Sequence, residues 1–431
     1  MIFDELKNII EEENKVGNFI YPSYKKYCFS NIPSTILKFL DVKTKGSALS
    51  PKIYKNKVEY EDSNKIILLL IDGYGYNQWL KCYKKYEFFK EISQRGAVSP
   101  ITTVFPSTTA AALTTINTGL TPQEHALLEW YVYFEEIDMI INTLPFTPLG
   151  KRGQDWLLEM GVNPKILYDG NTIHQALREE GVKSFAFIKA SYAHSCYSRI
   201  VHDGSTIIPF ISYSDMFTRL RKLVKKEKGP AYFYAYLDNL DGIGHLYGPH
   251  SVEYSAELSL LSYSIRREFL EKTKRKVAKE TLLLTTSDHG QVNISPEETI
   301  YLNKFQKLTD AFKRSEKGKT ILPTGSPRDV FLHIEPNKLE GTLTFLSKKL
   351  EAEAKVTKTK EATRRGLFGI GKPRKQFCER VGDLLVLPYN NRTVWYEHTE
   401  GKKIYSLGYH GGLNEDEMLV PFAITKLSEL L

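Results

Sequence analysis

Three hydrophobic runs of strand length along the chain each finish at or next to an acidic residue: KIILLLID (65–72), AYFYAYLDNLD (231–241) and TLLLTTSDH (281–289). Continuous apolar runs of this length are typical of strands buried on both faces of a parallel sheet. Between them the spacing of apolar positions predicts helices at 77–92, 171–181, 214–226 and 252–279. The pattern therefore predicts an α/β fold with a largely parallel sheet and helical crossovers.

Acidic residues stand at the tips of all three predicted strands, namely Asp72, Asp241 and Asp288. In open α/β sheets the functional groups gather beyond the carboxyl ends of the strands. We therefore expect these carboxylates to lie close together and to belong to one site.

The pattern of predicted strands and helices changes after about residue 320. The segment 324–398 contains a strand candidate (VFLHIEP), a helix candidate (GTLTFLSKKLEAEA), a basic glycine-containing loop and a further strand (VGDLLVLP). We interpret it as a small α+β module inserted into one catalytic domain, which comprises 1–323 and 399–431. Residues 1–60 are expected to pack on that domain as an N-terminal extension.

The composition mainly excludes certain classes of protein. Apolar residues make up 42% and charged residues 26% of 431 positions, which excludes a disordered chain, and no apolar run approaches the roughly 20 residues of a membrane span. The N-terminus carries acids where a secretory signal carries bases, so an amphipathic helix and a cytoplasmic location are expected. The four cysteines are far apart and form no CxxC pair, so neither a zinc ribbon nor a disulfide framework is expected.

The net charge of +8 raises nucleic-acid binding as a competing hypothesis. Two of the lysine clusters, 221–229 and 266–280, mix in glutamates as solvated helix faces do. The cluster at 358–375 is more one-signed and rich in glycine, so it is a candidate loop for an anionic ligand. Nucleic acid is therefore disfavoured as a partner, and a small anionic molecule is preferred.

Two motifs combine aspartate and histidine in patterns that suit metal ions. DNLDGIGHLYGP places Asp241 and His245 four residues apart, and TTSDHG ends a strand with adjacent Asp288 and His289, followed by a glycine that permits a turn. Asp72 in LLLIDGYG is a further carboxylate at a strand end. Each taken alone is also explained by a turn or a helix cap that bonds to its own backbone. The combination favours a metal centre.

A hydroxyl-rich turn opens the alanine-rich helix of VFPSTTAAALTTINTG (104–119). Ser107 or Thr108 can cap this helix, which leaves Thr109 in its first turn. A hydroxyl there lies near the positive end of the helix dipole and near free N–H groups, which favour an alkoxide and an anionic phosphate. The alternative is a helix cap without chemistry.

These motifs, taken in order, resemble the nucleotide pyrophosphatase/phosphodiesterase branch of the alkaline phosphatase superfamily. The matching elements are Asp72-Gly73, FPSTT (105–109), TGLTPQEH (118–125), DGIGHLYGP (241–249), DHG (288–290) and GYHGGLNEDEMLVP (408–421). The resemblance spans most of the chain. It implies an alkaline phosphatase-like fold, a mostly parallel sheet sandwiched by helices, and a hydrolase of phosphodiester or pyrophosphate bonds.

Carried over to this sequence, the resemblance implies two divalent metal ions and a threonine nucleophile, Thr109. One metal would be held by Asp241, His245 and His410. The other would be held by Asp72, Asp288 and His289, with Thr109 bridging toward it. Nitrogen and oxygen ligands without thiolate suit Zn²⁺, and Mn²⁺ is the alternative.

The sequence departs from the family pattern at Trp130, which stands where the nucleotide pyrophosphatases have an asparagine that helps hold the phosphoryl oxygen. Trp130 is instead a candidate substrate contact, because its ring could stack on a base or aryl group. The departure makes a nucleotide substrate less certain than hydrolysis itself. A small-molecule phosphodiester or nucleotide is the expected partner, and the oligomeric state is open.

Two other readings of the same residues stay open. One is a phosphomonoesterase or phosphomutase on the same fold, and the other is a non-catalytic anion-binding protein. A sulfatase is disfavoured because a threonine cannot mature to the formylglycine of that branch. The remaining histidines are expected to be structural: His125, His174, His194, His202, His250, His333 and His398.

Overall fold

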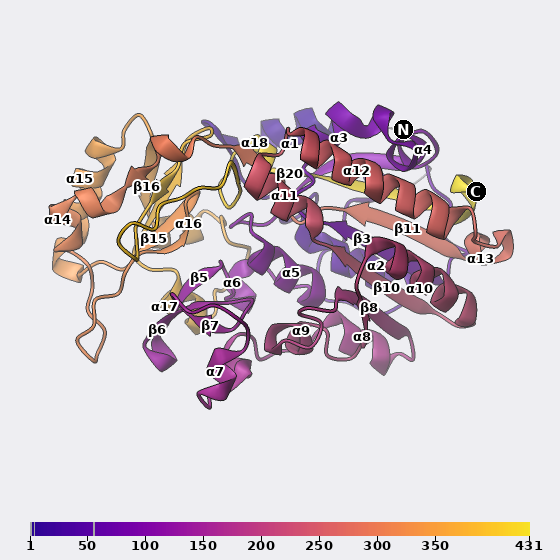
Figure 1. The fold of residues 1–431 in the computed structure, drawn as a ribbon, viewed down its shortest axis with the longest axis horizontal. Coiled ribbons are helices and arrows are strands. Elements are labelled where there is room, and N and C mark those ends of the chain that lie inside the picture. Colours follow the sequence, from indigo (N-terminus) through magenta and orange to yellow (C-terminus); the bar gives the residue numbers. More distant parts are fainter. Residues whose placement is uncertain (1, 4, 55–56) are drawn as a thin grey trace.

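The computed structural model describes residues 2–3, 5–54 and 57–431 and contains two seven-stranded sheets. In Figure 1 the main sheet lies to the right and the second sheet, with its helices, extends to the left along the longest axis. The helix α5 (Thr109–Thr118) lies between these two parts of the molecule.

The main sheet confirms the predicted α/β fold. Its neighbouring strands are parallel, except that β20 runs antiparallel to both β11 and β4. The three hydrophobic runs form the adjacent central strands β11, β3 and β10, in which every residue is buried, so helices cover both faces. In spatial order the strands are β4 (Ala97–Thr102), β20 (Leu419–Lys426), β11 (Thr281–Thr286), β3 (Lys65–Ile71), β10 (Ala231–Leu237), β8 (Lys183–Lys189) and β9 (Thr206–Phe210).

Most predicted helices are present with small shifts in their ends. The segment 171–181 forms α8 (Ile173–Glu179), and 214–226 forms α10 (Tyr213–Lys226). The segment 77–92 is divided into α3 (Tyr76–Cys82) and α4 (Glu87–Arg95). The N-terminal amphipathic helix is α1 (Glu5–Asn14), and other helices that surround the main sheet are α2 (Ile32–Phe39), α9 (Cys196–Val201) and α11 (Asn239–Tyr247).

The prediction of one helix over 252–279 was wrong. The helix α12 (Val252–Ser264) widens into a π-helical turn at Ile265–Leu270, and a separate short helix, α13 (Arg275–Lys279), follows. The Thr273 hydroxyl donates to the Phe269 carbonyl at 2.6 Å, which satisfies a carbonyl at the helix end. In the part of the chain that is described, no helix is long and apolar enough to cross a bilayer.

The second sheet combines two distant parts of the chain. Its segment 324–388 contains the predicted strands and the predicted helix, α15 (Leu339–Lys349), together with α16 (Thr359–Arg364) and α17 (Lys375–Arg380). This segment joins strands from 131–148 through the pairing of Gly325 with Tyr131. The division of domains at 324 and 398 stays a prediction. The strand order is β16 (Ala354–Lys358), β17 (Leu384–Pro388), β15 (Asp329–Leu332), β14 (Thr324–Ser326), β5 (Tyr131–Phe134), β6 (Met139–Asn142) and β7 (Thr147–Pro148).

Candidate active site

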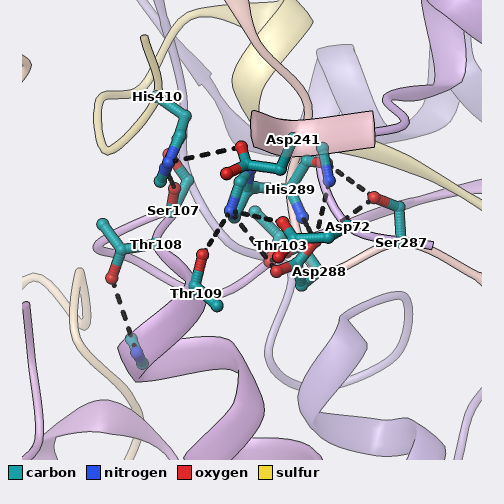
Figure 2. A network of polar contacts seen from close by, with 12 residues as sticks. Asp72, Thr103, Ser107, Thr108, Thr109, Asp241, Ser287, Asp288, His289 and His410 are labelled. Carbon is teal, nitrogen blue, oxygen red and sulfur yellow. Dashed lines mark hydrogen bonds and ion pairs between the residues drawn. The ribbon is translucent and has the colours of Figure 1, made fainter. Parts of the chain in front are cut away.

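The ends of the three central strands bring the predicted acidic residues together. Asp72 follows β3 directly, and Asp288 and His289 follow β11 after one intervening residue, on the turn that their adjacent positions require. Asp241 and His245 lie one turn apart on α11, which begins just after β10. Figure 2 shows that the side chains of Asp72, Asp241, Asp288, His289 and His410 point toward one another.

Close packing explains the glycine after Asp72. Gly73 has a φ of +71°, and a Cβ on this residue would lie 3.1 Å from the Asp241 Cα. A larger residue would therefore be strained and would also push α11 away from β3. The Asp-Gly pair lets two ligand-bearing elements approach each other.

The start of α5 separates the roles of two adjacent threonines. Thr108 is the N-cap, as one of the two sequence alternatives predicted, because its hydroxyl accepts from the Ala111 N–H and donates to the Leu128 carbonyl. Thr109 is the first helical residue, and its Oγ1 lies 3.1 Å from His289 Nε2. In Figure 2 Thr109 points into the cluster, whereas Thr108 points away from it.

The first cluster consists of Asp72, Asp288, His289 and the Thr109 hydroxyl. His289 Nδ1 lies 3.1 Å from the Gly290 carbonyl oxygen, which can only accept, so Nδ1 carries the hydrogen. The lone pair of His289 Nε2 therefore faces Asp72 Oδ1 at 3.4 Å and Asp288 Oδ2 at 3.3 Å. Among the described residues, neither of these buried oxygens has a hydrogen-bond donor.

The second cluster consists of Asp241, His245 and His410. His410 Nδ1 is bonded to the Ser107 carbonyl at 3.0 Å and His245 Nδ1 to the Gly408 carbonyl at 2.8 Å, so each Nδ1 carries the hydrogen. The two Nε2 lone pairs then face each other at 3.2 Å. Asp241 faces them with its carboxylate, at 3.4 Å from His245 Nε2 and 3.7 Å from His410 Nε2.

Both clusters fit divalent cations. The Nε2 lone pairs and the carboxylate oxygens that converge in each cluster repel one another unless a positive charge lies between them. Each imidazole also donates its other N–H to a backbone carbonyl, which is the arrangement that orients metal-binding histidines. In the described chain, ligand atoms of Asp72, Asp288 and His289, and those of Asp241, His289 and His410, lie within 4.8 Å of one another. The donor set contains no thiolate.

Burial gives these groups unusual protonation behaviour. Burial, and then the charge of Asp288, raise the pKa of Asp72 well above its usual value, and burial raises the pKa of Asp288 to about 7. Burial lowers the pKa of His289 to about 4, so its imidazole is neutral near pH 7. The neutral imidazole can bind a cation through Nε2, and a cation would compensate the buried negative charge of the two carboxylates.

Several residues that orient the clusters carry no signal in the sequence motifs. The Tyr236 hydroxyl on β10 donates to Asp72 Oδ2. The Gln291 amide donates to Asp241, both to its carboxylate and to its carbonyl, and the Thr103 hydroxyl donates to the Asp288 carbonyl. Gln291 directly follows the DHG motif (288–290), which is the one signal that the sequence offers.

A buried carboxyl pair lies beside this site and was also missed. Glu129 and Asp329 are almost completely buried, and Glu129 Oε1 and Asp329 Oδ2 have no hydrogen-bond partner within the described residues. Glu129 accepts from the Trp130 N–H, and Asp329 accepts from the Ser326 hydroxyl. Burial raises the pKa of Glu129 to about 7, and burial with the charge of Glu129 raises the pKa of Asp329 well above its usual value.

Two cavities meet at Thr109, and Trp130 and Asp241 also line both of them. The cavity beside α5 has a volume of about 470 Å³, and its mainly apolar wall includes Leu113, Tyr197 and Tyr234. The other cavity, of about 560 Å³, lies between β5 and the segment 395–410. Trp130, 41% exposed, therefore stands where a substrate contact was predicted, and that role stays a prediction.

Comparison with known proteins places this arrangement in a family. Residues 66–413 match the family described as type I phosphodiesterase/nucleotide pyrophosphatase. The venom phosphodiesterase CdcPDE of Crotalus durissus collilineatus is 22% identical over 236 residues, which are 53% of this chain and 26% of that enzyme. Venom phosphodiesterase 2 of Crotalus adamanteus is equally similar, with 27% of its length matched. The matched region thus spans about a quarter of these relatives.

Solved structures share the fold. Murine ectonucleotide pyrophosphatase/phosphodiesterase 5 superimposes with a TM-score of 0.62 at 16% identity, over 83% of this chain and 87% of that one. An inactive variant of the murine protein in complex with AMP gives 0.60 at 15% identity over the same shares. The human protein gives 0.60 at 18% identity, over 84% and 87%.

Proposed function

Because the chain belongs to the type I phosphodiesterase/nucleotide pyrophosphatase family, we propose that it hydrolyses phosphodiester or pyrophosphate bonds with Thr109 as nucleophile and two divalent cations as cofactors. The observation that carries this proposal is the position of the Thr109 hydroxyl, 3.1 Å from the neutral His289 Nε2 and beside two buried carboxylates. The other two hydroxyls of the FPSTT turn have different partners, because Thr108 caps the helix and Ser107 Oγ donates to the Gly412 carbonyl.

In this proposal Asp72, Asp288 and His289 hold one cation beside Thr109. Asp241, His245 and His410 hold the second. Zn²⁺ suits these ligands and Mn²⁺ is the alternative. When bound, such cations stabilise the entering and leaving oxygens of a displacement at phosphorus and lower the pKa of a coordinated hydroxyl.

The residues of the chain then carry the reaction in two steps. Thr109 Oγ1 attacks phosphorus, its proton passes to solvent, and the bond from phosphorus to the leaving oxygen breaks with that electron pair going to the oxygen. Water protonates the leaving group. A second water then attacks the phosphothreonine, gives up a proton, and releases Thr109 as the hydroxyl, so one water is consumed in total.

The phosphoryl oxygens are proposed to contact the start of α5. The first N–H groups of a helix have no partner within it, and they lie at the positive end of its dipole. This would replace the amide that the family's asparagine supplies and that Trp130 cannot. The ester group that stays on the phosphate is proposed to occupy the 470 Å³ cavity, which Asp72 also lines. Binding of AMP by the murine relative supports a nucleotide as that group.

Diesters are expected to be better substrates than monoesters. The residues after Thr109 are alanines, and the described lining of the 470 Å³ cavity includes no lysine or arginine. Within that cavity the extra negative charge of a monoester would thus lack a lysine or arginine partner, which costs roughly 1 to 3 kcal/mol or about tenfold to a hundredfold in rate.

The deciding measurement is kcat/KM for bis(p-nitrophenyl) phosphate against p-nitrophenyl phosphate, with Thr109→Ala as the control for contaminating activity. A clear preference for the monoester would contradict the diesterase proposal and favour a phosphatase.

A further inference from the structure

A third cavity lies apart from Thr109 and has no role in the proposed reaction. Its volume is about 480 Å³, and its lining shares no residue with the described linings of the two cavities at Thr109. It lies between the end of α6 (Pro122–His125), the segment 163–169 and α17. Figure 1 shows α17 beside α6 and β5. The cavity is thus a separate candidate site, formed by parts of the chain that lie far apart in the sequence.

The basic segment 358–375 is the predicted candidate loop for an anionic ligand, and it reaches this cavity through Arg374. Arg374 is half-buried, and its guanidinium carbon lies 5.8 Å from the centroid of the Tyr168 ring. Its side chain forms no hydrogen bond or ion pair with any residue that the structure describes. The charge of Arg374 is therefore available to a ligand.

Arg380 gives the cavity a second guanidinium, which is fixed in place and only 2% exposed. Its Nη1 donates to the Ala126 carbonyl at 3.0 Å, and its Nη2 donates to the Ile166 carbonyl at 2.7 Å. The same Nη2 bonds to the exposed Glu136 at 3.3 Å. The Nε–H of Arg380 has no acceptor among the described residues. A buried donor without an acceptor is costly, and it indicates that an acceptor from outside the chain binds here.

The two guanidiniums lie close enough to repel each other. Burial lowers the pKa of Arg380, and the charge of Arg374 lowers it further. Burial also lowers the pKa of His125 to about 3, and the charges of both arginines contribute to that shift. An anion bound between the two arginines would compensate this repulsion.

The other charged residues leave the cavity with a positive balance. Lys165 lines it as a third cation, and its partner Asp169 lies at 3.5 Å. Both of these side chains are exposed, so the pair is weak. Glu136, the other acid, pairs with Arg380. In the described lining, three cations therefore face two acids, and Arg374 has no acidic partner.

A phosphate group suits this arrangement better than a carboxylate does. The tetrahedral oxygens of a phosphate can accept from two guanidiniums and an ammonium at once, whereas a flat carboxylate is satisfied by one guanidinium. The cavity has room for more than a phosphate ion, and Tyr168 lines it beside Arg374. A small phosphorylated molecule therefore fits it.

We propose that this cavity binds the phosphate group of a small molecule, with Arg374 and Arg380 as its contacts and Lys165 at its rim. The site lies apart from Thr109 and does not depend on the proposed hydrolysis. Inorganic phosphate and a phosphomonoester offer the same chemistry, and the experiment distinguishes them.

Equilibrium dialysis of the metal-loaded enzyme against labelled inorganic phosphate counts the phosphates bound per chain. The active site should bind one, with an affinity that competitive inhibition of bis(p-nitrophenyl) phosphate hydrolysis measures independently, and we expect a second. Arg374→Gln should weaken the second phosphate by about tenfold or more and change the inhibition constant by less than about twofold. The matched control Arg364→Gln removes an exposed arginine of the same segment outside the cavity lining and should change neither value.

A second variant, Lys165→Gln, changes only an exposed side chain and should weaken the same phosphate by about threefold. A single phosphate per chain in the parent protein, or an unchanged second phosphate in Arg374→Gln, would overturn the site. Because dialysis needs no turnover, this result stands even if the proposed hydrolysis fails.

Competition for the phosphate that depends on Arg374 identifies the ligand. Displacement by ribose 5-phosphate at lower concentration than by unlabelled phosphate would identify a phosphomonoester, and the reverse order would identify phosphate itself. Displacement by malonate at lower concentration than by either would contradict the assignment to a phosphate group.

Discussion

Two neighbouring threonines at the start of α5 have the same side chain but different partners. Thr109→Ala should lower kcat by a factor on the order of 10³ or more, because it removes the only hydroxyl of this turn that faces His289. The metal content should be unchanged, because six protein ligands remain. Thr109→Ser should keep part of the activity. The measurement is steady-state hydrolysis of bis(p-nitrophenyl) phosphate together with metal analysis.

The control for this prediction is Thr108→Ala. It removes an N-cap and should cost about 1 kcal/mol of stability while most of the activity remains. If Thr108→Ala abolished turnover and Thr109→Ala did not, the nucleophile would be the preceding residue.

Glu129 gives a prediction on pH. Burial raises its pKa from 4.5 to about 7, so the folded protein binds this proton more tightly than the unfolded chain. Its contribution to the free energy of unfolding is therefore highest below pH 4.5. It falls as the pH rises from 4.5 through about 7, by about 3 kcal/mol in total. Glu129→Gln stays neutral and can still accept from Trp130, so it should be more stable than the parent protein at pH 8.5 and similar to it near pH 4.5.

Urea unfolding at both pH values measures this effect. Glu297→Gln changes an exposed acid, and it should show no such pH-dependent difference. A stability difference for Glu129→Gln that does not grow with pH would show that the carboxyl is solvated.

At the residue scale, the sequence predicted the side chains that the motifs contain. Asp72, Asp241 and Asp288 were recognisable because each follows an apolar run of strand length. Tyr236 and Glu129 were not recognisable, because their importance depends on which carboxylate lies opposite in space. A hydrogen bond between residues 164 positions apart, such as that from Tyr236 to Asp72, leaves no local pattern.

At the element scale, each ligand cluster is assembled from separate elements. The first joins the ends of β3 and β11, and the second joins α11 to the loop that carries His410. Since each cation would have only three side-chain ligands, we expect chelation to abolish activity. Asp241→Ala or His410→Ala should lower the metal content from two toward one per chain.

Metal analysis after desalting checks this expectation. His194→Ala, an exposed histidine outside both clusters, is the control and should retain both cations. Full activity in a metal-free preparation would exclude the proposed mechanism.

Periodicity predicted strands better than it predicted the ends of helices. The central strands were clear because every residue in them is buried, which leaves an uninterrupted apolar run. The break after α12 was missed because 252–279 contains neither proline nor glycine, the usual signals of an interruption. It depends instead on a π-helical turn and on a threonine that bonds back to Phe269.

At the scale of the whole molecule, the order of elements along the sequence did not indicate how the two sheets are connected. The segment 324–388 was recognisable as an α+β unit, but its pairing with 131–148 was not, because β14 and β5 pair at one position, Gly325 with Tyr131. The His410 loop depends on a second connection between the sheets. Arg328, just before β15, is fully buried and bonds through Nε and Nη2 to Glu417 at 2.9 and 2.7 Å.

Glu417 in turn holds the loop that follows His410, since its carboxylate accepts from the N–H groups of Gly412 and Asn414 at 3.0 and 3.1 Å. Arg328→Ala would leave this carboxylate buried without its partner, which typically costs 3 to 5 kcal/mol. We expect that loss in urea unfolding, and weaker binding of the cation at Asp241, His245 and His410 in a metal titration. Arg392→Ala removes a half-exposed arginine that pairs with Glu298 and Glu353, so it should cost less than about 1 kcal/mol and leave metal binding unchanged. If Arg328→Ala were as mild as Arg392→Ala, the second sheet would not stabilise the metal centre through this pair, and the His410 loop would have to be positioned by the main sheet alone.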